Sequence, residues 1–249
     1  MEFYLKTLQA LVAKGTLDPD ASTLVVAGGQ KDRAALLAAG FTNVTISNLD
    51  TRMKGYEFAP YAWALTDAEQ ISFDDNSYHQ VIDHMGLHHC GSPHRALLEM
   101  YRVASQFVLV FENRDSFTLR LATRLGVVPD YEIDAVVGND HKFGGFRNTA
   151  IPNFIYRWTE REVRKVIATI DPAHKVSIEF FYNLRYPSER INSFRGAKRL
   201  VLQCLKLPFT IYAMMLPRQA NEFGFCIKKR DRALQPWIDA KSGNLALDR

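Results

Sequence analysis

A stretch near the middle of the chain, residues 66–112, places the strongest limits on the fold. An acidic, polar segment leads into a short apolar strand at Val81 and Ile82, and the strand ends in a histidine-rich turn. A helix over 92–103 and a continuous apolar strand over 106–112 are expected to follow. This order predicts a βαβ unit with polar groups at the carboxyl end of its first strand, where open α/β sheets bind ligands.

A second unit of the same kind precedes this stretch. Residues 3–14 have apolar side chains at the spacing of a helix face, and 24–27 form an apolar strand that ends at two glycines. A helix over 32–39 and a strand over 43–47 follow, which completes a βαβ unit of about thirty residues. The segment 51–64 shows neither period and is expected to be irregular.

The pattern is weaker beyond residue 112. A helix over 115–126, an irregular segment over 127–153 and a helix over 159–170 are expected, then strands at 176–181 and 223–228. Thr159 and Glu162 have the spacing of a capping box at the start of the second helix.

An apolar run over 200–216 needs separate consideration, because it resembles a membrane span. Gln203, Lys206 and Pro208 interrupt it well short of the roughly 20 apolar residues that a span requires. We expect a core-packing helix or a lid, with an interfacial membrane helix as the alternative.

Charge and cysteine usage exclude some classes of protein. The net charge is +4, but residues 185–232 hold eleven Lys and Arg against three acidic residues, which suits an anionic substrate, a membrane surface, nucleic acid or a plain solvated face. Cys90, Cys204 and Cys226 form no CxxC pair, so neither a disulfide framework nor a metal site is expected. The first residues lack a signal-peptide pattern, which favours the cytoplasm.

Three groups of residues at expected strand ends carry candidate chemistry. Gly28 and Gly29 let a ligand approach the backbone at a helix N-terminus, although two glycines alone are often only a turn. Asn48 and Asp50 lie about twenty residues further on, where a side chain can bond ribose hydroxyls. Asp67 precedes the apolar strand at 80–82 and can hold an adenine amino group beside a backbone N–H.

With these motifs in place, the chain resembles the class I S-adenosylmethionine-dependent methyltransferases, in particular the methyltransferase type 11 group. The residues that carry the resemblance are Asp67-Ala68-Glu69, Phe73 to Tyr78, Leu87-His88-His89, Pro93, Leu97 to Ala104 and Phe107 to Glu112. The resemblance covers about residues 24–112. It implies a Rossmann-like doubly wound, mostly parallel seven-stranded sheet with helices on both faces and an inserted substrate-cover region.

The resemblance also implies roles for particular residues. Gly28 and Gly29 would approach the methionine part of S-adenosylmethionine, Asn48 or Asp50 the ribose, and Asp67 with Ala68 the adenine. The full set of cofactor-binding candidates is Gly28, Gly29, Gln30, Asn48, Asp50, Asp67, Ala68, Glu69 and Asp83. The family's usual acidic residue and two glycines are replaced by Val26, Gln30 and Asp32, so cofactor binding could be rearranged, weakened or lost.

A single domain over residues 1–249 is expected, with three regions. We expect a cofactor-binding half (1–112), an insertion with the acceptor pocket (113–175), and C-terminal strands with an apolar helical lid (176–249). Arg147 and Arg157 in the insertion could clamp an anionic group or pair with Glu160 or Glu162.

Three histidines follow the strand at 80–82 and are the catalytic candidates. His84, His88 and His89 would face an acceptor, where a neutral imidazole can accept a proton at physiological pH; packing or helix capping is the alternative.

The favoured function is methyl transfer to oxygen or nitrogen of a small, anionic or hydrophobic acceptor, in a protein that could form a homodimer. A non-catalytic binding or regulatory module on the same fold is the alternative. A nicotinamide-dependent oxidoreductase is disfavoured by the missing three-glycine fingerprint. A nucleic-acid substrate is not expected, because no Asp/Asn-Pro-Pro-Tyr motif follows the strand at 80–82.

Overall fold

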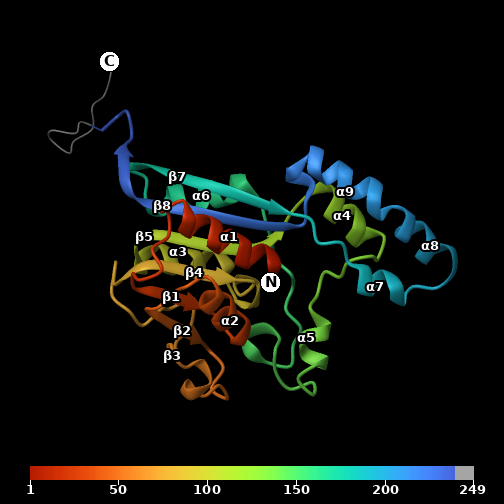
Figure 1. The fold of residues 1–249 in the computed structure, drawn as a ribbon, viewed down its shortest axis with the longest axis horizontal. Helices are drawn as coiled ribbons and strands as arrows, with labels where there is room; N and C mark the ends of the chain where they lie inside the picture. The colour runs from red at the N-terminus through yellow and green to blue at the C-terminus, as the bar shows by residue number, and fades with distance from the viewer. Residues whose placement is uncertain (239–249) are drawn as a thin grey trace.

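One mixed sheet organises the protein, whose computed structural model describes residues 1–238 (Figure 1). Its strands run in the order β3-β2-β1-β4-β5-β8-β7, with a short β6 paired to β5. The bounds are β1 (Thr23–Val26), β2 (Val44–Asn48), β3 (Ala62–Leu65), β4 (Tyr78–His84), β5 (Ala104–Arg114), β6 (Arg157–Trp158), β7 (His174–Asn183) and β8 (Glu222–Leu234). Residues 239–249, the end of the expected C-terminal region, lie outside the described residues.

The pairing of the strands confirms the expected doubly wound, mostly parallel sheet. Strands β1 to β5 pair in parallel, and β8 alone runs antiparallel, between β5 and β7. Seven strands make the main path and the two-residue β6 is an eighth. The order reverses between β1 and β4, so the crevice at their carboxyl ends is the place where such sheets bind ligands.

Alternate residues of the central strands fill two cores, one on each face of the sheet. Val25 and Ile82 pack with α1 (Glu2–Ala13) and α2 (Gln30–Ala38). Val26 and Val81 pack on the opposite face with α3 (Pro93–Val103) and α6 (Glu160–Ile170). Side chains that alternate across a strand explain why these strands are apolar throughout, since both faces are covered by helices.

The hydrogen bonds at the first turns of two helices agree with the predicted helix starts in part. Ser92 Oγ accepts from the Arg95 N–H at the start of α3, and Thr159 Oγ1 accepts from the Glu162 N–H at the start of α6. The Glu162 carboxylate does not return to the Thr159 N–H as a capping box requires. It bonds Tyr156 and His94 instead, so that half of the prediction is wrong.

The segments predicted to be irregular contain some regular structure. Residues 51–64 include η1 (Gly55–Phe58) and most of β3, and 127–153 include α5 (Ile133–Val137) and η3 (Phe146–Asn148). Strand β3 pairs only with β2 at the edge of the sheet, so its burial does not alternate and leaves no period to read in the sequence.

A helical arm extends from the sheet on the side of α5, at the right of Figure 1. It comprises α7 (Ser188–Ser193), α8 (Gly196–Cys204), α9 (Lys206–Met215) and η4 (Pro217–Gln219), and α4 (Phe117–Arg124) lies beside it. The run over 200–216 therefore forms two helices, and most of its large side chains are exposed, so the prediction of core packing is wrong. Among the described residues, no helix has the length and hydropathy to cross a membrane.

Candidate functional site

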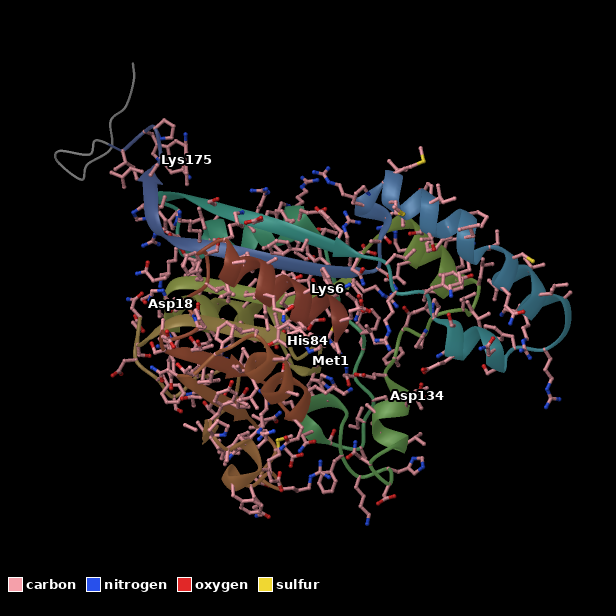
Figure 2. All side chains as sticks on the ribbon, viewed as in Figure 1. Met1, Lys6, Asp18, His84, Asp134 and Lys175 are labelled. Carbon is pink, nitrogen blue, oxygen red and sulfur yellow. The ribbon has the colours of Figure 1, made fainter. Side chains whose placement is uncertain are left out.

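Two adjoining cavities lie at the carboxyl ends of β1, β2 and β4. The smaller has a volume of about 300 Å³ and the larger about 1340 Å³. Seven residues line both: Ala27, Asn48, Met53, Met85, His89, Asn139 and Gly144. Met1, which precedes α1, Lys6 of α1 and His84 of β4 line the larger cavity, and Figure 2 places all three near the centre of the molecule.

The turn after β1 is tighter than its two glycines suggest. A Cβ on Gly28 would lie 2.7 Å from Val25 Cγ1, so this glycine serves packing, whereas a Cβ on Gly29 would meet open space. The Gly29 N–H is already bonded to Asp32 Oδ2 at 2.8 Å. Ala27 adopts a φ of 49°, a left-handed conformation that is strained for alanine. Gly29 is thus the glycine whose position leaves room for a ligand.

Replacing Ala27 with glycine is expected to stabilise the protein by about 1 kcal/mol, since relief of the left-handed strain exceeds the added chain entropy of the unfolded state. Urea unfolding would measure the change. Ala34 is exposed within α2, so Ala34→Gly should instead lose about 0.5–1 kcal/mol. A loss of stability in both variants would contradict the assignment of strain to Ala27.

The ribose candidates at the end of β2 are held by neighbouring groups. Asn48 Nδ2 donates to the Gly28 carbonyl at 2.9 Å and its Oδ1 accepts from the Asp50 N–H at 3.0 Å. Asp50 forms a two-point ion pair with Arg52, whose hydrogen bonds hold the pKa of Asp50 below its usual value. Both line the smaller cavity, but Asn48 keeps one N–H and one lone pair available, whereas Asp50 already has a cation.

The adenine candidates also line the smaller cavity. Asp67 Oδ1 accepts from the Glu69 N–H at 2.9 Å, and its Oδ2 is 3.9 Å from Arg147 Nη2. Ala68 is buried beside them. Glu69 accepts from the N–H groups of Gly91 and Ser92, so its carboxylate anchors the two residues that lead into α3. Asp67 Oδ2 accepts no hydrogen bond from the described residues and has only the more distant Arg147 as a cation, so it can still accept a hydrogen bond from a ligand.

A group of buried polar atoms lies beneath the turn. Tyr4 Oη, Asp32 Oδ1 and Asp83 Oδ1 are buried without a hydrogen-bond partner among the described residues. Burial, followed by the charges of Glu112 and Asp32, raises the pKa of Asp83 well above its usual value. Asp83 lines neither cavity, whereas Asp32 lines the larger one.

His84 is held beside this group. Its ring stacks on Tyr4 with centroids 4.3 Å apart, and its Nδ1 lies 3.6 Å from Asp32 Oδ1. It lines the larger cavity, with a side chain only 15% exposed.

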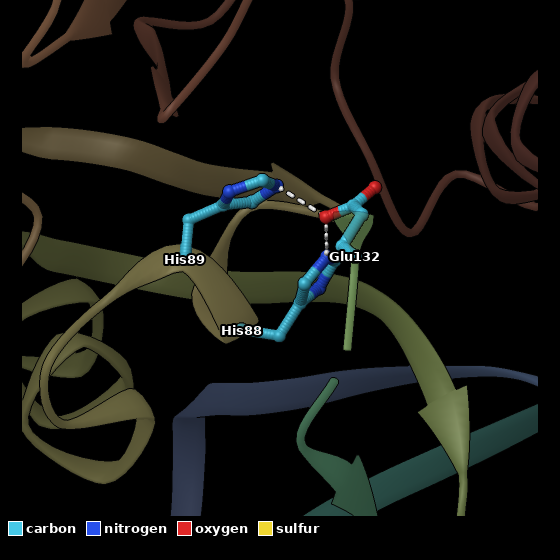
Figure 3. Close-up of side chains that lie close together, drawn as sticks. All are labelled: His88, His89 and Glu132. Atoms are coloured by element: carbon cyan, nitrogen blue, oxygen red, sulfur yellow. Dashed lines mark hydrogen bonds and ion pairs between the residues drawn. The ribbon is translucent and has the colours of Figure 1, made fainter. Parts of the chain in front are cut away.

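His88 sits between two carboxylates in η2 (Leu87–His89), as Figure 3 shows for one of them. Its Nδ1 lies 2.8 Å from Glu112 Oε2 and its Nε2 lies 3.3 Å from Glu132 Oε2. Burial opposes protonation of this ring, but the charge and hydrogen bond of Glu112, with those of Glu132, raise the pKa of His88 to about 10. His88 is therefore an imidazolium at neutral pH and has no lone pair to accept a proton.

The surroundings of His89 have the opposite effect on its pKa from those of His88. Its Nε2 lies 3.2 Å from the same Glu132 oxygen, and its side chain is 33% exposed (Figure 3). Burial and the charge of His88 lower the pKa of His89. Burial also opposes ionisation of Glu132, yet the hydrogen bond and charge of His88 outweigh it and lower the pKa of Glu132. At neutral pH, a neutral His89 thus faces an ionised Glu132.

The same three side chains place potential metal-ligand atoms within 4.8 Å of one another. The protonated His88 already supplies a positive charge between the carboxylates of Glu112 and Glu132, so these two groups are paired without a metal cation.

The sequence did not single out several partners that define this site. Glu112 ends an apolar strand and Glu132 lies in a segment without a period, so only the tertiary fold brings them to His88. Arg157 pairs with Asp130 at 2.8 Å and not with Glu160 or Glu162. Arg147 lies 3.5 Å from Glu69 and lines the smaller cavity.

The sheet order and this polar edge define an open α/β fold with a ligand crevice at the carboxyl ends of β1 and β4. Residues 24–107, about a third of the chain, match the family of methyltransferase domains of type 11. This match identifies that part of the chain as similar to a methyltransferase domain, so S-adenosylmethionine is the cofactor against which the site is tested. No curated protein matches the sequence.

Solved structures share the fold at low sequence identity. A candidate methyltransferase from Bacillus halodurans C-125 is 16% identical, with a TM-score of 0.54 over 90% of this chain and 99% of that one. Magnesium protoporphyrin IX methyltransferase from Synechocystis PCC 6803, solved with bound SAH, is 14% identical, with a TM-score of 0.52 over 92% and 82%. A SAM-dependent methyltransferase from Thermotoga maritima is 15% identical, with a TM-score of 0.51 over 92% and 91%.

The residues present fit this cofactor. The smaller cavity offers an open Asp67 oxygen and a free N–H on Asn48. Asp32 lies at the start of α2 and lines the larger cavity, and its Oδ1 accepts no hydrogen bond from the described residues, so the carboxylate suits the cationic end of the cofactor's methionine part.

Proposed function

We propose that the protein transfers a methyl group from S-adenosylmethionine to an oxygen or nitrogen atom of a small-molecule acceptor in the larger cavity. The observation that carries this proposal is the position of His89, which lines both cavities. A neutral base between a donor and an acceptor space is within reach of the proton that a hydroxyl or ammonium loses during methylation.

The proposed chemistry needs one bond made, one broken and one proton moved. The cofactor supplies a methyl group already activated on a sulfonium. A lone pair of the acceptor forms the new bond to the methyl carbon as the carbon–sulfur bond breaks. His89 Nε2 lies 3.2 Å from Glu132 Oε2, so Nδ1 is the ring nitrogen that would accept the acceptor's proton. The negative charge of Glu132 would stabilise the imidazolium that forms.

The lining of the larger cavity supports an acceptor with apolar and anionic parts. Phe3, Phe111 and Tyr186 supply aromatic surface. Lys31, Arg185 and Lys206 supply cations, which favour an anionic group away from the carboxylates around His89.

Cofactor titration by calorimetry tests the first requirement of the proposal. We expect S-adenosylmethionine to bind with a dissociation constant of about 1–100 µM. Asp67→Ala should weaken binding by about ten- to a hundredfold, since it removes the open carboxylate oxygen of the smaller cavity. Asp74→Ala is the control, because Asp74 is exposed on the following loop and lines neither cavity. No binding at millimolar cofactor would overturn the proposal.

A non-catalytic binding module is the second candidate. It is favoured because the residues expected to bind the ribose already bond other groups of the protein. Asp50 is bound to Arg52, and Asn48 bonds the backbone on both sides of its amide. Such a module would bind the cofactor or a nucleoside in the calorimeter, yet release no S-adenosylhomocysteine with any acceptor from a panel of alcohols, phenols, amines and glycolipids.

A further inference from the structure

The helical arm carries an unusual amount of exposed apolar surface. In α8 and α9, Leu200, Leu207, Met214 and Met215 are 63%, 68%, 75% and 76% exposed. Val201, Leu205, Ile211 and Leu216 are also among the exposed large hydrophobic residues. A patch of this kind on a water-soluble domain marks a surface that binds something.

Helix α4 extends this surface toward the body of the protein. Its Phe117 and the nearby Leu125 are 62% and 59% exposed, and Leu121 is exposed between them. The Lys198 ammonium of α8 donates to the Leu125 carbonyl at 3.1 Å, which ties the two elements together. Thr118 of α4 donates to the carbonyl of Gln219 in η4, which follows α9. We call the exposed apolar residues of α4, α8 and α9, together with Leu125, Leu205 and Leu216, the arm face.

The charges of the α8 and α9 part of the arm face are of one sign, whereas Asp115 beside α4 pairs with Arg120. Between Arg190 and Asn221 the sequence has no acidic residue. It has six basic ones: Arg190, Arg195, Lys198, Arg199, Lys206 and Arg218. Arg218 lies 3.6 Å from Glu160 of α6, and Glu189 and Glu222 flank the segment, so the acidic groups stand at its margins.

We propose that the arm face binds an anionic lipid bilayer surface, with α8 and α9 lying in the plane of the headgroups. A bilayer supplies an apolar interior for the leucines and methionines and negative headgroups for the basic residues. A second copy of the chain, paired by two-fold symmetry, would place these like charges opposite one another. Charge complementarity therefore selects the lipid surface.

The lengths of the helices agree with a position in the interface. Helices α8 and α9 have 9 and 10 residues, and their break at Leu205 leaves each about 15 Å long, half the thickness of a bilayer core. Neither can cross the bilayer, but both can lie on it.

The arm face adjoins the larger cavity. Lys206 and Thr210 of α9 line that cavity, while Leu207 and Ile211 beside them in sequence are exposed. An acceptor with a lipid tail would thus reach His89 from the membrane side. This consequence rests on the proposed function, whereas membrane binding does not.

Co-sedimentation of the full chain with vesicles tests the proposal. We expect binding to phosphatidylcholine vesicles that contain about 30% phosphatidylglycerol, and much weaker binding to pure phosphatidylcholine or at 0.5 M salt, about where charge attraction is screened. The double variant Met214→Ser and Met215→Ser should lose at least about tenfold in affinity. Tyr56→Ser is the matched control, because Tyr56 is 80% exposed on η1, outside the arm face, and should change nothing.

A variant with reversed charge and a measurement of the protein's molecular mass in solution, which detects a dimer, complete the experiment. Lys198→Glu with Arg199→Glu should lower binding to the anionic vesicles about tenfold or more. Absence of binding to anionic vesicles would overturn the proposal. So would a dimer that the methionine double variant dissociates and that anionic vesicles do not dissociate. Vesicle binding without cofactor binding would instead defeat the proposed function and leave the membrane surface standing.

Discussion

Replacing His89 with asparagine is expected to lower kcat by about 10²–10⁴-fold, because the variant loses the base between the two cavities. Affinity for S-adenosylmethionine should change little, since no candidate cofactor contact depends on the imidazole. Release of S-adenosylhomocysteine with an accepted substrate would measure the rate. His79→Asn, at the amino end of β4, lines neither cavity and serves as the control.

The pH profile separates a base from a structural histidine. Because burial and His88 lower the pKa of His89, the rate should stay level down to the ordinary imidazole value of about 6.5 and fall only at more acid pH. An unchanged kcat in His89→Asn would remove this residue from the mechanism. A decline that begins near pH 8 would assign the base to another group.

Replacing His88 with leucine is expected to cost about 3–5 kcal/mol of unfolding free energy, because it leaves Glu112 buried without its cation. The Glu112 side chain is 0% exposed and that of His88 is 3% exposed. Urea unfolding at pH 7 would measure the loss. Adding Glu112→Gln to the same chain should recover most of it, since a neutral amide replaces the unpaired charge.

The same pair predicts how stability depends on pH. The folded-state pKa of His88, about 10, lies above the unfolded value near 6.5, so its contribution is complete below pH 6.5 and disappears as pH rises toward 10. The wild-type protein should lose stability across this range, and His88→Leu should lose distinctly less. Parallel curves for the two proteins would show that His88 is not charged in the folded state.

The sequence by itself determined the central part of this fold. Apolar strands that end in glycines or polar residues, and helices between them, fixed β1, β4 and β5 because local pattern and buried position agree in these elements. The same strand ends placed Asn48, Asp67 and His89 at one edge of the sheet, and all three line the smaller cavity.

Only the tertiary structure decided which of these side chains is available. Asp50 matched the ribose position in sequence, yet its neighbour Arg52 turns back on it. His88 and His89 are adjacent and chemically identical, but the Glu112 carboxylate from the next strand raises the pKa of the first and keeps it protonated. Burial beside that charge lowers the pKa of the second and leaves it neutral. The physical reason is that hydrophobic periodicity is local, whereas the charge on a buried ring depends on groups that distant segments bring within about 3 Å.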